Sequence, residues 1–188
     1  MSTKTQNAQI HNGVNIDQMV GTVNAIKGTP SLAKFNFRSS SKWGGGAKSS
    51  SYVKSFYGAG QETVRKEAFT FEGDEPQVLL GNDTAPNAVE ALLSALTGCM
   101  TVSFIYAASP QGIKVHSLEY TIDGDVDLLG FLQLDPATKV GLQNIRVRAN
   151  VRADASKEKI QELLDYATKT SVVMDTLRSG VPISVELA

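Results

Sequence analysis

The stretch EALLSALTGCMTVSF, residues 90–104, is the centre of a helix that the sequence predicts over residues 86–109. Asn87 is a candidate N-cap, and Glu90 stands three residues later, where the acid of a capping box occurs. Apolar residues cover this helix on nearly every side, and such a helix is buried on most faces. The helix is therefore a central element of the fold, and it carries Cys99, the only cysteine of the chain.

The remaining elements are grouped by type along the chain. Two more helices are predicted at residues 15–30 and 156–180, with Asn15 and Ser156 as their candidate N-caps. Six strands are predicted at residues 32–39, 50–58, 67–73, 113–128, 142–154 and 182–187, and WGGGAK at residues 43–48 joins the first two as a hairpin. The fifth strand alternates: Ile145, Val147, Ala149 and Val151 are predicted to face inward, and Arg146, Arg148, Asn150 and Arg152 outward. Because strands follow strands instead of alternating with helices, the class is α+β.

A chain of 188 residues suits one domain with an adequate core. We expect a polar N-terminal tail over residues 1–14 and a single domain over residues 15–188. A helix that is apolar on every side needs more cover than a monomer of this size supplies. An obligate homodimer that buries it between protomers is the natural solution.

Composition excludes several classes of protein. The net charge is −1, and no basic run with interleaved aromatic residues is present, so a nucleic-acid partner is not expected. No uninterrupted apolar run reaches the roughly 18 residues of a membrane span. His11, His116 and one cysteine do not form a metal-ligand pattern, so neither a metal nor another cofactor is expected. A polar N-terminus and a lone cysteine favour the cytoplasm.

The thiol of Cys99 is either a buried packing side chain or a reactive nucleophile. Free cysteine is commonly a small buried hydrophobe. Its helical face is shared by Leu92, Ala95, Leu96, Val102, Ser103 and Tyr106. Apolar neighbours of this kind raise a thiol pKa, so a reactive role requires a charge brought from elsewhere in the fold.

The chain resembles the OsmC/Ohr family, whose members include thiol-dependent organic hydroperoxide reductases. Residues 74–101, DEPQVLLGNDTAPNAVEALLSALTGCMT, follow the family's series of acidic-Pro, Leu-Gly, Pro-x-x-x-Glu and small-Gly-Cys. Residues 112–132, GIKVHSLEYTIDGDVDLLGFL, are also similar to the family. With KFNFRSSSKW at residues 34–43 and TSVVMDTLRSGVPISVEL at residues 170–187, the resemblance extends from about residue 15 to residue 188.

The resemblance implies an intertwined homodimer in which two antiparallel sheets surround two central helices. It implies that Cys99 is the peroxidatic thiol, whose thiolate attacks the distal oxygen of a hydroperoxide and becomes a sulfenic acid. In such family members a second cysteine on the second helix then forms a disulfide, which a dithiol reduces. The same resemblance implies a role in oxidative and osmotic stress.

Two positions depart from the family pattern. Ser171 stands where the second cysteine is expected, and serine cannot resolve a sulfenic acid. The activating arginine belongs to a Gly-Gly-Arg context in the first hairpin, where this chain offers only Lys48, with Arg38 on the preceding strand. Glu90 is the candidate acid that orients this cation, with helix capping as the alternative. Lys48 is alternatively a solvated hairpin charge, and Ser171 a packing residue.

The sequence thus predicts a one-cysteine thiol peroxidase acting on organic hydroperoxides, with an external thiol as reductant. Its predicted catalytic residues are Cys99, Glu90, Lys48 and Arg38. The predicted substrate pocket contains Leu96, Ser103, Tyr106 and Ser171. The alternative is a non-catalytic dimer that binds a small hydrophobic ligand.

Overall fold

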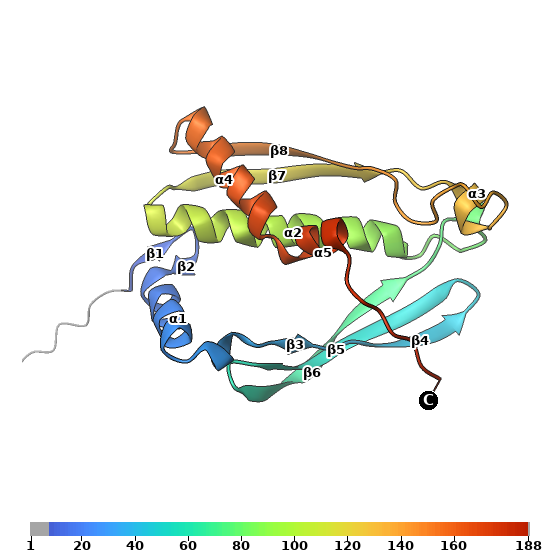
Figure 1. The fold of residues 1–188 in the computed structure, drawn as a ribbon, viewed down its shortest axis with the longest axis horizontal. Coiled ribbons are helices and arrows are strands. Elements are labelled where there is room, and N and C mark those ends of the chain that lie inside the picture. The colour runs from blue at the N-terminus through green and yellow to red at the C-terminus, as the bar shows by residue number, and fades with distance from the viewer. Residues whose placement is uncertain (1–7, 188) are drawn as a thin grey trace, which may run out of the picture. The chain divides into compact units, whose positions relative to one another are not determined.

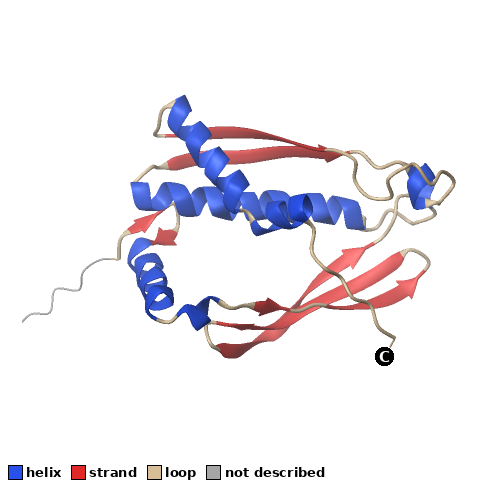
Figure 2. Ribbon diagram, viewed as in Figure 1, coloured by secondary structure: helices blue, strands red, loops and turns tan. Residues whose placement is uncertain are grey.

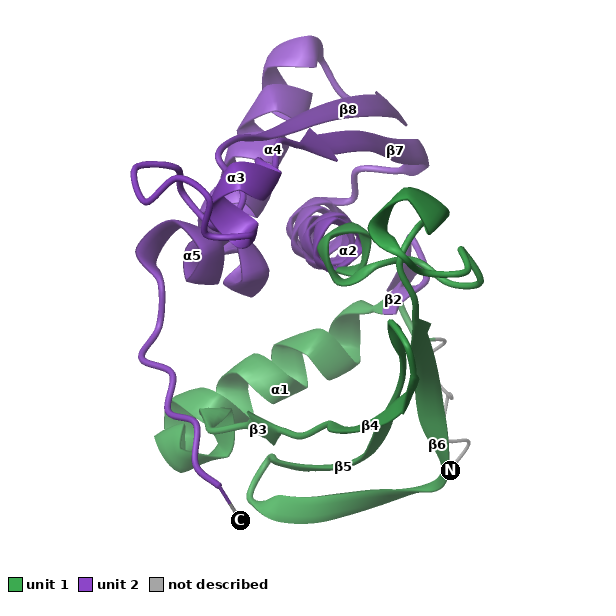
Figure 3. Ribbon diagram, turned by 90° about the vertical axis from the view of Figure 1, so that its right-hand side faces the viewer, with its two compact units in different colours: residues 1–9, 15–91 green, residues 10–14, 92–188 purple. Residues whose placement is uncertain are grey.

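The computed structural model describes residues 8–187 (Figure 1). The chain divides into two compact units, which are coloured separately in Figure 3: residues 1–9 with 15–91, and residues 10–14 with 92–188. Each unit combines helices with antiparallel strands (Figure 2), which confirms the α+β class. That residues 15–188 form a single domain stays a prediction.

The first unit begins with helix α1 (Ile16–Gly28). Asn15 caps it as predicted, because its side-chain oxygen accepts a hydrogen bond from the backbone N–H of Gln18 at 3.0 Å. A 3₁₀ turn, η1 (Pro30–Ala33), follows where the sequence predicted the start of a strand. Proline fits the first position of a helical turn, and the predicted strand 32–39 therefore shrinks to β3 (Asn36–Phe37).

An antiparallel sheet makes up the rest of this unit. Strand β5 (Lys48–Gly58) pairs with β3, with β4 (Ser40–Gly45) and with β6 (Gln61–Gly73). The predicted hairpin at WGGGAK is present between β4 and β5. Strand β6 starts six residues before the predicted residue 67. Ala59 and Gly60 both have positive φ angles, 50° and 81°, and make the tight two-residue turn that starts β6 early.

Asp74 organises the loop between β6 and the central helix. Its carboxylate accepts hydrogen bonds from the backbone N–H groups of Glu75, Asn82 and Thr84 and from the Thr84 hydroxyl, at 2.7–3.2 Å. The loop contains a 3₁₀ turn, η2 (Gln77–Leu79). Gly81 is required beside it, because a Cβ there would collide with the backbone carbonyl of Glu75.

The second unit includes a short segment from the start of the chain. Strands β1 (Ile10–His11) and β2 (Val14–Asn15) form a hairpin. Asn12 ties its turn to the unit: its amide donates to Ser109 Oγ at 3.1 Å and to the Ile113 carbonyl at 2.9 Å, and its oxygen accepts from Val115 N. Residues 10–14 of the predicted tail are therefore ordered, while residues 1–7 lie outside the described residues.

Helix α2 (Ala88–Ala108) lies within one residue or two of the predicted bounds and continues into the 3₁₀ turn η3 (Ser109–Gln111). Among the described residues, Ala88–Gln111 is the one helical stretch long and apolar enough to cross a membrane by length and composition, a test that core helices also pass. Part of α2 is core: Phe104 and Ala108 pack with Leu163 and Ala167 in a fully buried cluster.

Strands β7 (Val115–Gly124) and β8 (Ile145–Ala153) form an antiparallel pair. The predicted alternation along β8 is confirmed for Ile145, Val147 and Val151, which are half-buried while the arginines between them are exposed. Ala149, also predicted to face inward, is exposed. Arg146 pairs on the outer side with Asp123 and Asp125. The connection contains a short helix, α3 (Leu128–Phe131), that the sequence did not predict.

The predicted helix 156–180 is broken into α4 (Lys157–Thr170) and α5 (Val172–Ser179). Ser156 caps α4 as expected, accepting a hydrogen bond from Lys159 N at 3.2 Å. The break falls at Ser171, whose extended backbone (φ −67°, ψ 116°) stops the first helix and starts the second.

The predicted last strand, residues 182–187, is wrong for this chain. The backbone after Gly180 has no regular structure as far as residue 187. A strand needs a neighbour to accept its backbone hydrogen bonds, and no strand of the described residues pairs with this segment. Its apolar residues Ile183, Val185 and Leu187 are 82–103% exposed.

Candidate functional site

Cys99 lies in the middle of α2 and is half-buried. The helix carries the buried residues Leu96 and Met100 on either side of it in sequence. Such a position fixes the backbone that carries the thiol, because Cys99 lies well inside the helix. Partial exposure leaves the sulfur within reach of a small molecule.

The side chain that acts on this thiol from outside α2 is that of Ser171, in the second unit. It is completely buried at the junction of α4 and α5. Its backbone N–H bonds to the Ala167 carbonyl at the end of α4, and its hydroxyl accepts from the backbone N–H of Met174 at 3.2 Å. A small residue with a hydroxyl is needed here, because one side chain both caps α5 and remains able to donate a proton.

The environment of Cys99 favours the thiolate. Burial acts to raise the pKa of the thiol, but hydrogen bonds from the Ser171 hydroxyl and from the backbone N–H groups of Val173 and Val172 together hold that pKa below its ordinary value. Hydrogen bonds donated to the charged form stabilise it. The sulfur therefore faces three donors.

These donors are the first turn of α5 and its cap. The first N–H groups of a helix have no partner inside the helix, and they carry the positive end of the helix dipole. A thiolate at this position satisfies those groups while they stabilise its charge. Lowered thiol pKa values are typical of cysteines at helix N-termini. Within the second unit, the groups that lower the pKa of Cys99 are thus all neutral: two backbone N–H donors and a hydroxyl.

Glu90 has the structural role that the capping interpretation predicts. Its carboxylate accepts from Asn87 N at 2.8 Å, and its own N–H donates to Asn87 Oδ1 at 2.9 Å. This reciprocal pair is a capping box at the start of α2. A second role for Glu90, as the acid that orients a cation, stays a prediction.

The two predicted cations lie in the first unit. Arg38 bridges to Glu62 at 2.6 Å and donates from Nε to Asn36 Oδ1 at 2.8 Å. Lys48 is half-buried at the start of β5, opposite Gly45, and makes no ion pair within residues 8–187. The guanidinium of Arg38 is therefore already engaged on its own sheet. An activating role for either residue stays a prediction.

The residues predicted for the substrate pocket separate in the structure. Leu96 lines a cavity of the second unit, described below. Ser103 is half-buried and Tyr106 is about half exposed, and neither lines that cavity. Ser171 belongs to the surroundings of the thiol.

The sequence did not predict that the N-terminus of α5 faces Cys99. A signal was present: Ser171 is a preferred N-cap residue, and Asp175 supplies an acid for the first turn of a new helix. The apolar periodicity runs on through this point, so the pattern predicted one continuous helix. The backbone donors of Val172 and Val173 have no signature in side-chain type.

The chain belongs to the OsmC-like protein family. The family described as OsmC-like protein matches residues 81–186, which is more than half of the chain and includes Cys99 and Ser171. The resemblance seen in the sequence is thereby confirmed. A comparison with curated proteins found no match.

Solved structures of the same kind share the fold. An OsmC-like protein from Mycoplasma pneumoniae aligns with a TM-score of 0.60 and 16% identity, over 77% of this chain and 89% of that one. An OsmC-like protein of unknown function from Vibrio cholerae aligns with a TM-score of 0.58 and 12% identity, over 75% of this chain and 92% of that one. An organic hydroperoxide resistance protein OsmC from Legionella pneumophila aligns with a TM-score of 0.50 and 12% identity, over 76% of this chain and 89% of that one. These likenesses show the OsmC-like fold.

Proposed function

We propose that this protein is a one-cysteine thiol peroxidase that reduces organic hydroperoxides and is recycled by an external thiol. The observation that carries the proposal is the set of donors around Cys99, the Ser171 hydroxyl and the first N–H groups of α5, which lower the pKa of the thiol. The thiolate is the form that attacks a peroxide, and susceptibility to oxidation follows thiolate character and exposure.

The reaction balances without a metal or a second cysteine. The sulfur of Cys99 attacks the distal oxygen, an S–O bond forms, and the O–O bond breaks. The alkoxide takes up a proton and leaves as an alcohol, and a sulfenic acid remains on Cys99. One external thiol displaces water from the sulfenic acid to form a mixed disulfide. A second external thiol releases the reduced cysteine and an oxidised disulfide.

Ser171 sets the character of this cycle. Its hydroxyl donates to the sulfur but cannot form a disulfide, so the sulfenic acid must wait for a thiol from solution. We include a homodimeric state, a cytoplasmic location, where thiols are kept reduced, and a role in the response to oxidative and osmotic stress in the proposal. Support for the function also comes from the family and from the hydroperoxide resistance protein of Legionella pneumophila, which has the same fold.

Steady-state turnover with cumene hydroperoxide and dithiothreitol tests this function. We expect consumption of hydroperoxide in proportion to protein, with its complete loss in Cys99→Ser. Tyr166→Phe is a matched control, because this exposed tyrosine lies on α4 and belongs neither to the predicted catalytic residues nor to the predicted substrate pocket. Hydroperoxide consumption that survives in Cys99→Ser would exclude the proposed nucleophile.

A second candidate is favoured by one observation, the cavity of the second unit. A non-catalytic dimer that binds a small hydrophobic molecule would use this cavity and leave Cys99 as a packing residue. Such a protein would bind its ligand without consuming hydroperoxide. Turnover therefore separates the two functions.

A further inference from the structure

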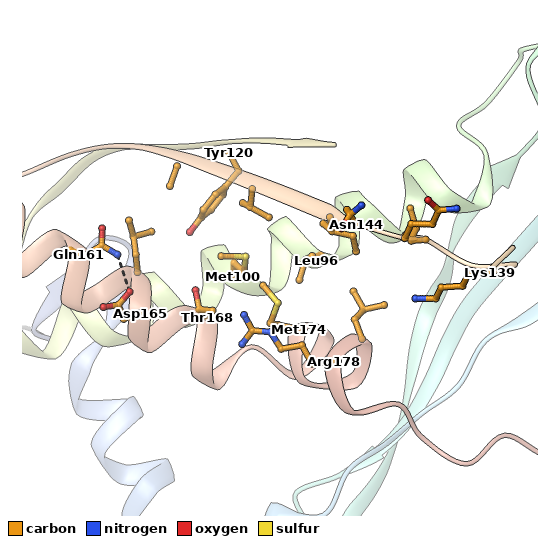
Figure 4. Close-up of a pocket in the computed structure, with 17 residues that line it drawn as sticks. Leu96, Met100, Tyr120, Lys139, Asn144, Gln161, Asp165, Thr168, Met174 and Arg178 are labelled. Carbon is orange, nitrogen blue, oxygen red and sulfur yellow. Dashed lines mark hydrogen bonds between the residues drawn. The ribbon is translucent and has the colours of Figure 1, made fainter. Parts of the chain in front are cut away.

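A cavity of about 640 Å³ lies within the second unit, between the β7–β8 pair and the helices α2, α4 and α5 (Figure 4). Its walls combine apolar and polar side chains, and the apolar ones include Leu96 and Met100 from α2, Val147 from β8, Leu164 from α4, and Met174 from α5. The volume is in the range of small-molecule sites. Cys99 does not line it.

Tyr120 places a hydrogen-bond donor inside this cavity. Its ring points from β7 into the space (Figure 4). Its hydroxyl is buried and has no hydrogen-bond partner among the described residues. Burial raises the pKa of this phenol, so the hydroxyl keeps its proton and remains a donor. Buried polar groups in folded proteins are nearly always paired, and an acceptor supplied by a ligand would complete this one.

Two cations line the same cavity without partners. The Arg178 guanidinium enters from α5, and Lys139 enters from the loop before β8 (Figure 4). Neither makes an ion pair or hydrogen bond within residues 8–187. The one acidic side chain of the lining, Asp165, accepts a hydrogen bond from Gln161 at 2.8 Å. The lining thus has a net positive charge, and Asp165 lies on the far side from Lys139 in Figure 4.

We propose that this cavity binds an amphipathic carboxylate that carries a second oxygen, such as a straight-chain hydroxycarboxylic acid. The carboxylate pairs with Arg178, Lys139 adds positive charge to the lining, and the carbon chain lies along Leu96, Met100 and Leu164. The second oxygen accepts the hydrogen bond of the Tyr120 hydroxyl. The site is separate from the thiol, and the proposal does not rest on the peroxidase function.

Calorimetric titration with ω-hydroxydecanoate and decanoate tests the site. Cys99→Ser protein serves for all titrations, so that thiol chemistry does not contribute and loss of peroxidase activity has no bearing on the result. We expect the hydroxylated acid to bind more tightly than decanoate. Tyr120→Phe should remove that difference, about tenfold in Kd for one buried hydrogen bond, and leave decanoate unchanged.

Arg178→Gln tests the role of charge, and it should weaken the binding of both acids. Arg152→Gln is the matched control, because Arg152 is exposed on the outward side of β8 and does not line the cavity. Decanol, which has the chain without the carboxylate, should bind more weakly than decanoate. A shorter and a longer hydroxy acid then show which chain length spans the two polar ends.

Three results would overturn the proposal. One is equal affinity of decanol and decanoate, which would reduce the site to an apolar cavity. Another is an unchanged preference for the hydroxylated acid in Tyr120→Phe. The third is no binding of either acid. If Tyr120→Phe then changes the dimer dissociation constant, a second copy of the chain fills the cavity.

Discussion

Ser171 shows how one residue changes the chemistry available to a neighbouring thiol. A cysteine at this place could form a disulfide with Cys99, whereas the serine offers a hydroxyl that donates to the sulfur and caps α5 at the same time. The proposed result is a thiol that is easily ionised but is not resolved within the chain. The pKa of Cys99 and the stability of α5 are therefore linked through a single side chain.

Ser171→Ala should remove both the donor and the cap, and a separate measurement reports on each. Loss of the donor raises the pKa of Cys99, so alkylation by iodoacetamide near neutral pH should slow about fivefold, since one hydrogen bond contributes on the order of 1 kcal/mol. Loss of the cap should lower the free energy of unfolding by about 1 kcal/mol. Ser156→Ala is the matched control, because it removes the cap of α4 at a distance from the thiol. An equal slowing of alkylation in both variants would refute a direct role for Ser171.

Ser171→Cys should convert the protein to a two-cysteine cycle. The Ser171 hydroxyl helps to lower the pKa of the Cys99 thiol, which puts the two side chains near each other, and a disulfide requires Cα atoms roughly 4.4–6.8 Å apart. One equivalent of peroxide should form the bridge, and dithiothreitol should reopen it. Overoxidation of Cys99 by excess peroxide should slow, because condensation competes with further attack. Failure to bridge in a folded, peroxide-reactive sample would contradict the placement of Ser171 beside Cys99.

At the scale of elements, the sequence predicted what local patterns encode. The caps Asn15 and Ser156, the extent of α2 and the alternation of β8 follow from side-chain type and spacing. The break at Ser171 was missed because apolar spacing continues across it. The thiol environment was missed for a related reason: its donors include backbone N–H groups, which every residue except proline possesses.

The loop after β6 depends on the ionised form of Asp74. The Thr84 hydroxyl and the backbone N–H groups of Glu75, Thr84 and Asn82 lower the pKa of this carboxyl to about 2. Because the folded pKa lies below the unfolded value of 3.8, this contribution to stability is present above about pH 4 and is lost as the pH falls toward 2. Asp74→Asn should abolish that part of the acid transition, since an amide cannot accept all four bonds.

Limited proteolysis between Glu75 and Asn87 measures the effect on the loop directly. Asp74→Asn should be cleaved faster than the unchanged protein at neutral pH. Asp83→Asn is the control, because Asp83 is exposed in the same loop and asparagine suits its positive φ of 56°. Similar cleavage of both variants would show that the Asp74 contacts do not hold the loop.

At the scale of the whole molecule, much apolar surface is left in water by one chain. Phe37, Trp43 and Phe71 of the first unit are 64–78% exposed, and Ile183, Val185 and Leu187 of the final segment are 82–103% exposed. Large exposed apolar side chains in each unit are expected to be covered by a partner. The final segment alternates like a strand but has no strand beside it, which explains why its sequence pattern predicted a strand that one chain does not form.

We expect the protein to be a homodimer at micromolar concentration, measured by light scattering. Val185→Glu should weaken the dimer, because it puts a charge on a segment that has no cover in the monomer. Glu186→Gln, which alters the adjacent residue without adding charge, should leave the dimer intact. A folded monomer at micromolar concentration would remove the basis for an intertwined assembly.

The central claim is that Cys99 is a reactive thiolate, and intact-mass spectrometry after peroxide treatment tests it most directly. With one equivalent of cumene hydroperoxide in the presence of dimedone, we predict a single adduct on Cys99 and none in Cys99→Ser. Without dimedone, excess peroxide should drive the same thiol to sulfinic and sulfonic acids, because the chain has no second cysteine to protect it. A folded sample whose thiol stays unmodified under both conditions would contradict the account.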